Sequence, residues 1–397
     1  MSKVSVRNVT LAKAKVDMSE VEKKKAALAK MFPDTDIRIG SDATLDIPRI
    51  STGSIVVDSI IGGGLPAGRI TEIFGPYSSG KTTFALTSIA NVQKNGGSAL
   101  FIDLESSLDP RWAKRLGVDL ESLIVVSPDL GSEALDLLSK AVTMKAFDII
   151  VFDSIGGLVA DGVYTDGTDH TGMGEVARML SNVLPPIAQN AKKTQTTVVF
   201  INQLRANLTG YGASETTRGG KAVQYFASLR LRVSRQGKKG QIVEDGKTVG
   251  VTLNIKVEKN KTAAPDREAE TVVNFRRGLD PSVEAFGVGV QLGIIEAATI
   301  KTYKFRGEVI TSQGRKAAIT KIRETPALYK SIHQEIVKKL EEALDDGYDA
   351  EDLDDAFGAV LRTRFSQVAE HVINAQAAEE GPLVHIDGMI WMPKDLA

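Results

Sequence analysis

Short apolar runs alternate with helix-like segments through the middle of the chain. Between about residues 50 and 273 the runs are rich in Val and Ile, and stretches with helical spacing separate them. The predicted strands are residues 70–74, 98–102, 123–126, 148–152, 197–201, 229–233 and 251–258. Strands of this kind, with helices between them, form a mostly parallel sheet covered by helices on both faces. We therefore predict an α/β core whose ligand lies at the carboxyl ends of the strands.

The pattern changes on both sides of this core. Residues 18–32 predict a short, strongly basic helix, because Ser19 can cap its start and Pro33 bounds its end. From residue 278 the composition shifts, and residues 326–344 predict another helix. Residues 341–357 hold nine carboxylates and no Lys or Arg, and a helix-like segment follows them. A basic element thus precedes the core, and an acidic, partly apolar extension ends the chain.

Composition and charge set limits on the chemistry. Of the 397 residues, 42% are hydrophobic and 25% are charged, as is ordinary for a globular protein. The 49 Lys and Arg residues balance 50 Asp and Glu residues, so nucleic acid could bind only at local basic patches. Cysteine is absent, which excludes disulfides, thiolate metal sites and cysteine nucleophiles. We find neither a secretion signal nor an apolar run of about 18 residues, and we expect a cytoplasmic protein.

The loop after the first predicted strand fits the spacing G-x-x-x-x-G-K-T at Gly75, Gly80, Lys81 and Thr82. Glycines let successive backbone N–H groups surround an anion, Lys81 reaches the outer phosphates, and the Thr82 hydroxyl binds Mg²⁺. The strand before the loop and the helix after it are the context that this motif requires. The sequence therefore predicts a nucleoside triphosphate with Mg²⁺. The predicted contacts in this segment are Gly75, Pro76, Tyr77, Ser78, Ser79, Gly80, Lys81, Thr82 and Thr83.

Polar residues follow three further strands at their carboxyl ends. Asp153 ends an apolar run and is the expected second partner of Mg²⁺, although such an Asp is often a helix cap or a turn former. Glu105 is placed to polarise an attacking water, with Asp103 and Asp109 as competitors by position. Gln203 can orient water or sense a γ-phosphate, and a polar, glycine-rich segment follows it.

Several longer motifs, in family order, resemble those of the bacterial RecA recombinases, including the versions carried by phages. They are STGS at 51–54, GGLPAGRITEIFGPYSSGKTT at 63–83, FIDLESSLDP at 101–110, VFDS at 151–154, FINQLR at 200–205, ETTRGG at 215–220 and KNKTAAP at 259–265. The resemblance covers about residues 18–345. It implies an N-terminal region for subunit docking at 1–48, a RecA-like ATPase core at 49–277 and a small C-terminal α/β domain at 278–345. Residues 346–397 form an extension that does not match the family.

The resemblance gives expected roles to matching residues of the nucleotide site. Glu105 falls at the family's catalytic glutamate, and Gln203 at the glutamine that couples nucleotide state to the DNA-binding loop. Asp109 and Trp112 are expected to bind the cofactor, and Trp112 matches the position of an aromatic residue, Tyr in the family, that packs on the nucleotide base. Lys259 and Lys261 match a pair that reaches the neighbouring subunit's γ-phosphate and stabilises transition-state charge.

Two loops, at about 162–174 and 204–218, are expected to line a filament axis and to bind single-stranded DNA. The predicted DNA contacts are Met173, Gly174, Arg178, Arg205, Leu208, Tyr211, Gly219 and Gly220. For Leu208 and Tyr211, packing within the loop is an equal alternative. Tyr225 and Arg230 match family positions at the subunit interface. A basic hairpin (Arg232, Arg235, Lys238, Lys239, Lys247) and the cations Arg306, Arg315 and Lys316 are either further DNA contacts or an ordinary solvated surface.

These observations favour an ATP-dependent, DNA-stimulated recombinase that forms a helical filament on single-stranded DNA and exchanges strands with duplex DNA. Its expected ligands are ATP and Mg²⁺, and its expected partners are DNA and further copies of the chain. Single-strand-binding and loading proteins are additional candidates, and the location would be a host's cytoplasm for a phage protein. The alternatives are a P-loop regulatory ATPase or small-molecule kinase, and a hexameric helicase-type motor.

Overall fold

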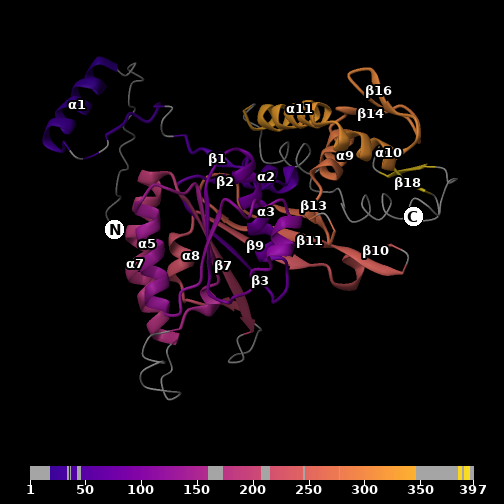
Figure 1. The fold of residues 1–397 in the computed structure, drawn as a ribbon. Helices are drawn as coiled ribbons and strands as arrows, with labels where there is room; N and C mark the ends of the chain where they lie inside the picture. Colours follow the sequence, from indigo (N-terminus) through magenta and orange to yellow (C-terminus); the bar gives the residue numbers. More distant parts are fainter. Residues whose placement is uncertain are drawn as a thin grey trace, which may run out of the picture. The chain divides into compact units, whose positions relative to one another are not determined.

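The computed structural model describes residues 18–345 except 34, 36, 43–45, 160–172, 207–214, 245 and 277, together with 383–386 and 389–393. The chain divides into two compact units, residues 1–47 and 48–397. The first contains helix α1 (Met18–Met31), which agrees with the predicted basic helix (Figure 1). All elements described below belong to the second unit.

The second unit is built on one 11-stranded sheet. Along the sheet, the order is β13 (Gly278–Leu279), β12 (Glu268–Asn274), β11 (Lys247–Asn260), β9 (Leu229–Arg235), β3 (Ile70–Gly75), β7 (Thr197–Ala206), β6 (Ile149–Asp153), β4 (Ala99–Asp103) and β5 (Leu123–Val126). Two short strands lie off this path, with β10 (Gln241–Glu244) beside β11 and β8 (Glu215–Thr217) beside β7. The six strands from β9 to β5 are parallel, which confirms the predicted parallel core. An antiparallel extension begins where β11 pairs with β9.

Helices cover both faces of the parallel strands, as the period of two in each strand requires. In β4, Ala99 and Phe101 pack into one buried cluster, whereas Leu100 and Ile102 pack into the other. The first cluster includes residues of α2 (Ile55–Ile61) and α3 (Lys81–Lys94) and the buried Ala113 of α4 (Pro110–Arg115). The second includes residues of α5 (Gly131–Thr143), α7 (Met173–Thr194) and α8 (Ala222–Phe226), which lie together in Figure 1.

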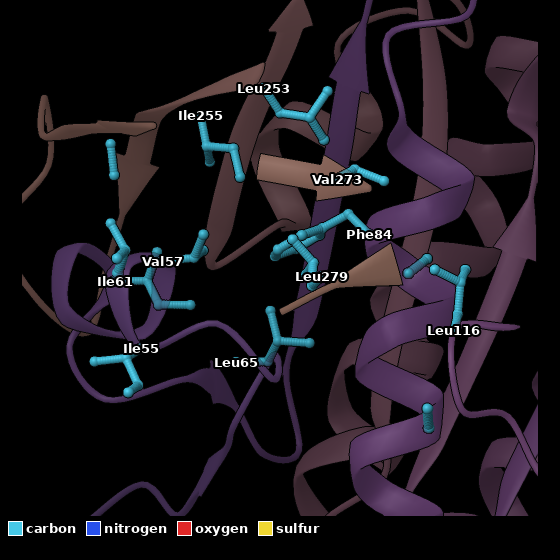
Figure 2. Packing of buried hydrophobic residues seen from close by; sticks show 14 of the residues in the cluster. Ile55, Val57, Ile61, Leu65, Phe84, Leu116, Leu253, Ile255, Val273 and Leu279 are labelled. Atoms are coloured by element: carbon cyan, nitrogen blue, oxygen red, sulfur yellow. The ribbon is translucent and has the colours of Figure 1, made fainter. Parts of the chain in front are cut away.

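The first cluster also joins the sheet to the C-terminal elements. Figure 2 shows Phe84 of α3 beside Val273 of β12 and Leu279 of β13, with α2 residues nearby. The C-terminal elements are α9 (Pro281–Gln291), β14 (Ile295–Ala297), β15 (Tyr303–Phe305), β16 (Glu308–Thr311), α10 (Arg315–Glu324) and α11 (Pro326–Asp345). Helix α9 packs against α2, α10 and α11, so this layer shares its core with the sheet.

The remaining short elements are β1 (Arg49–Ile50), β2 (Leu65–Pro66), η2 (Ile155–Gly157), η4 (Gly237–Gly240), β17 (Leu383–Ile386) and β18 (Met389–Pro393).

Two carboxyl groups, the half-buried Asp58 and the buried Glu284, lie where α2 meets α9. Asp58 accepts hydrogen bonds from Ser51 and Thr52, and Glu284 Oε1 accepts from Ser54 Oγ at 2.8 Å and Thr271 Oγ1 at 2.5 Å. Burial raises the pKa of Asp58 to about 6 and that of Glu284 to about 7, since desolvation outweighs the hydrogen bonds. Glu284 Oε2 has no protein partner. The junction therefore favours a protonated Glu284.

We predict that Glu284→Gln flattens the dependence of stability on pH. Because the folded pKa of about 7 exceeds the ordinary 4.5, the stability contribution of the protonated group is complete below pH 4.5 and lost as pH rises through 7. Gln resembles the protonated form, so between about pH 5 and pH 8 the wild type should lose stability at this site while the variant does not. The unfolding free energy of the variant minus that of wild type should therefore be roughly 1–3 kcal/mol larger at pH 8 than at pH 5. Thermal unfolding at both pH values measures this gain. Glu268→Gln, an exposed control on β12, should show none, and a gain absent from Glu284→Gln would contradict the prediction.

Candidate active site

The loop between β3 and α3 has the geometry of a phosphate-binding loop. A Cβ on Gly75 would lie 2.0 Å from the Val233 carbonyl oxygen of the neighbouring strand, so only glycine fits where β3 ends. Gly80 caps α3 with a φ of +95°, a left-handed conformation that glycine adopts without strain. The Ser79 hydroxyl is buried and has no hydrogen-bond partner within the protein. A phosphate oxygen in this loop would supply that partner.

Lys81 lies in the first turn of α3 and folds back over the loop. Its Nζ donates to the carbonyl oxygens of Pro76 at 2.7 Å and Gly75 at 3.3 Å. Burial lowers the pKa of Lys81, while Asp153 and Glu105 oppose this change. The ammonium group is thus held at the loop by weak acceptors that a phosphate can replace.

Thr82 and Asp153 form the oxygen-rich pair that the motif predicts for Mg²⁺. Thr82 Oγ1 donates to Asp153 Oδ2 at 2.7 Å, which joins α3 to the end of β6. Burial raises the pKa of Asp153 to about 6, and the neighbouring carboxylates Glu105 and Asp103 add to the rise. A cation would relieve this repulsion. Among the described residues no cluster of three or more His, Asp or Glu could hold a metal.

Glu105 and Gln203 face each other across the carboxyl ends of the strands. Gln203 Nε2 donates to Glu105 Oε1 at 2.9 Å, and the same oxygen accepts from Ser154 Oγ. Asp103 instead accepts backbone N–H bonds from Glu105, Ser107 and Leu108, so its carboxylate shapes the loop. This arrangement favours Glu105 over Asp103 as the group that meets an attacking water.

A cavity of about 320 Å³ adjoins the loop on the side where a nucleotide base would extend. Its lining includes Gly80, Thr83, Trp112 and Phe275. The Trp112 Nε1 donates to Thr83 Oγ1 at 3.2 Å, which fixes the indole beside α3. Asp109 caps α4 by accepting from the N–H groups of Arg111 and Trp112, so it positions this aromatic residue.

Only parts of the expected DNA loops lie within the described residues. Residues 160–172 and 207–214, with Leu208 and Tyr211, fall outside them, as do the side chains of Met173 and Arg205. Met173, Gly174 and Arg178 lie in the first turns of α7. The second loop has a hairpin stem, since Leu204 pairs with Thr217 and Ala206 with Glu215. Gly219 and Gly220 follow this stem with positive φ values.

The predicted interface residues lie away from the phosphate loop along the strands: Lys261 is at the level where β3 starts, whereas Lys259 and Arg230 are in register with Glu72 in the middle of β3. Lys261 N donates to Ser228 O, and Ser228 N donates to Ile70 O at the start of β3, whereas Gly75 ends that strand. The five residue steps from Ile70 to Gly75 span about 16 Å. The Nζ atoms of Lys259 and Lys261 contact the carbonyl oxygen of Tyr225, whose side chain is 71% exposed. The lysine pair therefore does not reach the phosphate loop of its own subunit.

Two residues of this region, Ser154 and Glu72, were given no role by reasoning from sequence. Ser154 contacts Glu105, and its signals were its position directly after Asp153 and its place in the motif VFDS. Glu72 is fully buried in β3 and contacts Asn202 and Arg230. A charged residue within the apolar run ITEIF was a signal that could have drawn attention to it.

Comparison with known proteins gives consistent matches. The RecA N-terminal domain family matches residues 18–280. Protein RecA of Thermus aquaticus is 40% identical over 78% of this chain and 90% of the relative, and Protein RecA of Thermotoga neapolitana is 39% identical over 83% and 95%. Among solved structures, the RadB recombinase is similar at a TM-score of 0.44 and 22% identity, over 57% of this chain and 97% of that chain. The family match spans the phosphate loop, Glu105, Gln203 and the lysine pair.

No helix in the described parts of the chain combines the length and apolar character needed to cross a membrane.

We predict that the fluorescence of Trp112 reports nucleotide binding. The indole borders the cavity beside the phosphate loop, so a bound base would change its environment. Titration with a non-hydrolysable ATP analogue and Mg²⁺ should give a saturable change in emission. The chain has two tryptophans, and Trp391→Phe should keep the change whereas Trp112→Phe should abolish it. The reverse pattern would place the nucleotide elsewhere.

Proposed function

The chain belongs to the RecA family and is an ATP-dependent recombinase of recombination and repair, and from this premise we propose how its residues perform that function. In the proposal, the chain polymerises head to tail on single-stranded DNA, hydrolyses ATP in response to that DNA, and pairs the bound strand with homologous duplex. A cytoplasmic location and the division of the chain at residues 49, 278 and 346 stay predictions.

The observation that carries the proposal is the separation of two groups of residues, which we propose to be complementary halves of one catalytic site. Lys81, Thr82, Glu105, Asp153 and Gln203 converge at the carboxyl ends of the strands. The lysine pair lies away from that end: Lys261 is at the level where β3 starts, and Lys259 is in register with Glu72 in the middle of β3. A head-to-tail contact brings one subunit's lysines to the next subunit's phosphates, and such a contact generates an open polymer when the rotation does not close.

Hydrolysis would use these residues in distinct roles. The backbone of residues 75–80 and the Lys81 ammonium hold the β- and γ-phosphates, and Glu105 accepts hydrogen bonds from the attacking water. Thr82 and Asp153 would hold Mg²⁺, which neutralises phosphate charge when bound. Gln203, which donates to Glu105, would contact the γ-phosphate, and it directly precedes the part of β7 that forms the DNA-loop stem. Lys259 and Lys261 of the neighbour stabilise charge that develops on the phosphoryl group.

DNA binding would follow from the same arrangement. The stem of Leu204–Ala206 and Glu215–Thr217 continues directly from Gln203, so a change at the γ-phosphate alters the base of this loop. Nucleotide then acts as an effector that binds two filament states with different affinity. Arg178 and Gly174 begin α7 next to the first loop and would contact phosphates of the DNA backbone.

We predict that single-stranded DNA strongly stimulates ATP hydrolysis and that salt weakens the stimulation. Phosphate contacts release counterions, so the stimulation should fall across a salt series. Lys81→Ala should reduce hydrolysis by roughly 100-fold or more, because it removes a charge that stabilises the transition state. Lys94→Ala, an exposed change at the other end of α3, is the control and should retain the wild-type rate. Hydrolysis indifferent to DNA would instead indicate a regulatory P-loop ATPase.

A second prediction concerns the contribution of each subunit to its neighbour's site. Glu105→Gln and Lys261→Ala should each be inactive alone. In a polymer of the first variant every site lacks Glu105, and in a polymer of the second every site lacks the Lys261 that the neighbouring subunit would supply. In a 1:1 mixture, about a quarter of the contacts in a random head-to-tail polymer combine an intact Glu105 with an intact Lys261. The mixture should therefore recover about a quarter of the wild-type rate. A mixture no more active than its components would contradict action across the interface.

A further inference from the structure

Glu72 places a charged side chain in β3, in the middle of the sheet. The Glu72 carboxylate is fully buried. Its strand pairs directly with β7 and β9, and Glu72 lies three residues before Gly75, where the phosphate loop begins. A buried carboxylate is costly unless its oxygens are paired, and both oxygens of Glu72 have partners on different strands. Strand β3 lies between β7 and β9 in the sheet. Glu72 therefore connects elements that are distant in sequence.

On the β7 side, Glu72 holds the base of the expected DNA loop. Asn202 Nδ2 donates to Glu72 Oε1 at 2.8 Å and also to the carbonyl oxygen of Arg218 at 2.9 Å. Asn202 Oδ1 accepts from the Gln203 N–H at 2.9 Å. One amide thus links the buried carboxylate to Gln203 and to the end of the hairpin stem, where β8 has just ended.

On the β9 side, Glu72 holds the strand that borders the lysine pair. Arg230 Nε donates to Glu72 Oε2 at 2.5 Å, and its guanidinium lies 4.5 Å from the centre of the Phe74 ring. Arg230 pairs in register with Lys259 of β11. Burial, Lys261 and Arg230 all lower the pKa of Lys259, whereas Glu72 raises it. The carboxylate thus helps to keep this lysine charged beside two other cations.

We propose that Glu72 is a positioning residue that couples the DNA loop to the lysine pair offered to the next subunit. The Arg218–Asn202–Glu72–Arg230 connection runs across three adjacent strands and bypasses the γ-phosphate. A shift of the DNA-loop stem is transmitted through Asn202 to Glu72, and from there through Arg230 to the β9–β11 edge that carries Lys259. DNA bound to one subunit would in this way adjust the lysines that act on its neighbour's nucleotide. This inference rests on the proposed function.

Two substitutions interrupt the connection at different points. Glu72→Gln keeps the shape of the side chain but leaves Arg230 without a countercharge at a site where that arginine is only 15% exposed. Asn202→Ala removes the link to Arg218 and leaves the Glu72–Arg230 ion pair in place. Glu268→Gln makes the same chemical change on β12 of the same sheet, in an exposed pair with Lys256, and serves as the control.

The measurement compares single-stranded DNA binding in ADP and in a non-hydrolysable ATP analogue, by anisotropy of a labelled oligonucleotide. Wild type and Glu268→Gln should bind DNA at least about tenfold more tightly with the analogue, a typical size for coupling between sites. In Glu72→Gln and Asn202→Ala this ratio should fall to about half of the wild-type ratio or less, because only the route through Gln203 remains, while nucleotide affinity from Trp112 fluorescence stays within about twofold of wild type. A merely structural role would weaken binding with both nucleotides and leave the ratio unchanged.

The outcomes separate this inference from the proposed function. If wild type binds DNA equally with both nucleotides, the proposed function fails. If wild type shows the difference and both variants retain it, only the role of Glu72 is overturned. Circular dichroism establishes that the variants are folded. Should Glu72→Gln not fold, Asn202→Ala decides the question, because it preserves the buried ion pair and a retained ratio in it overturns the connection.

Discussion

Everything in the second unit depends on how tightly β3 is held between its two neighbours. A Cβ at Gly75 would overlap the carbonyl group of Val233, so the strand must end in glycine for the chain to turn into the phosphate loop. Parallel pairing with β7 and β9 places Gln203 beside Gly75 and Arg232 beside Phe74. The loop that follows β3, Gln203 and strand β9 therefore take their positions from one strand.

Features set by local sequence could be predicted, whereas features set by contacts between distant segments could not. The strands followed from runs of Val and Ile, and the phosphate loop from its glycine spacing, because both depend on nearby residues. Position alone could not separate Glu105 from Asp103, since the distinction lies in which carboxylate accepts backbone N–H bonds. Glu72 meets Asn202 and Arg230 at separations of 130 and 158 residues, which no local pattern indicates.

Buried charge serves two purposes in this fold. Glu72 is balanced by Arg230, so its contacts hold strands together. Around the phosphate loop the charges are incompletely balanced: burial raises the pKa of Asp153 and lowers that of Lys81. A site with unsatisfied charge and an unpaired Ser79 hydroxyl is suited to bind a charged ligand. Buried charge therefore stabilises the sheet where it is paired, at Glu72 and Arg230, and favours ligand binding where it is incompletely balanced, around the phosphate loop.

If the lysine pair acts on a neighbour's nucleotide as proposed, its separation from the phosphate loop would also give a polymer of this chain a chemical polarity. One terminal subunit would hold a nucleotide that no neighbour's lysines can reach, and the other would present lysines with no nucleotide to act on. Hydrolysis would then be confined to interior subunits. The nucleotide at the first end would persist as a cap, so the two ends would grow and shorten at different rates even in a uniform solution.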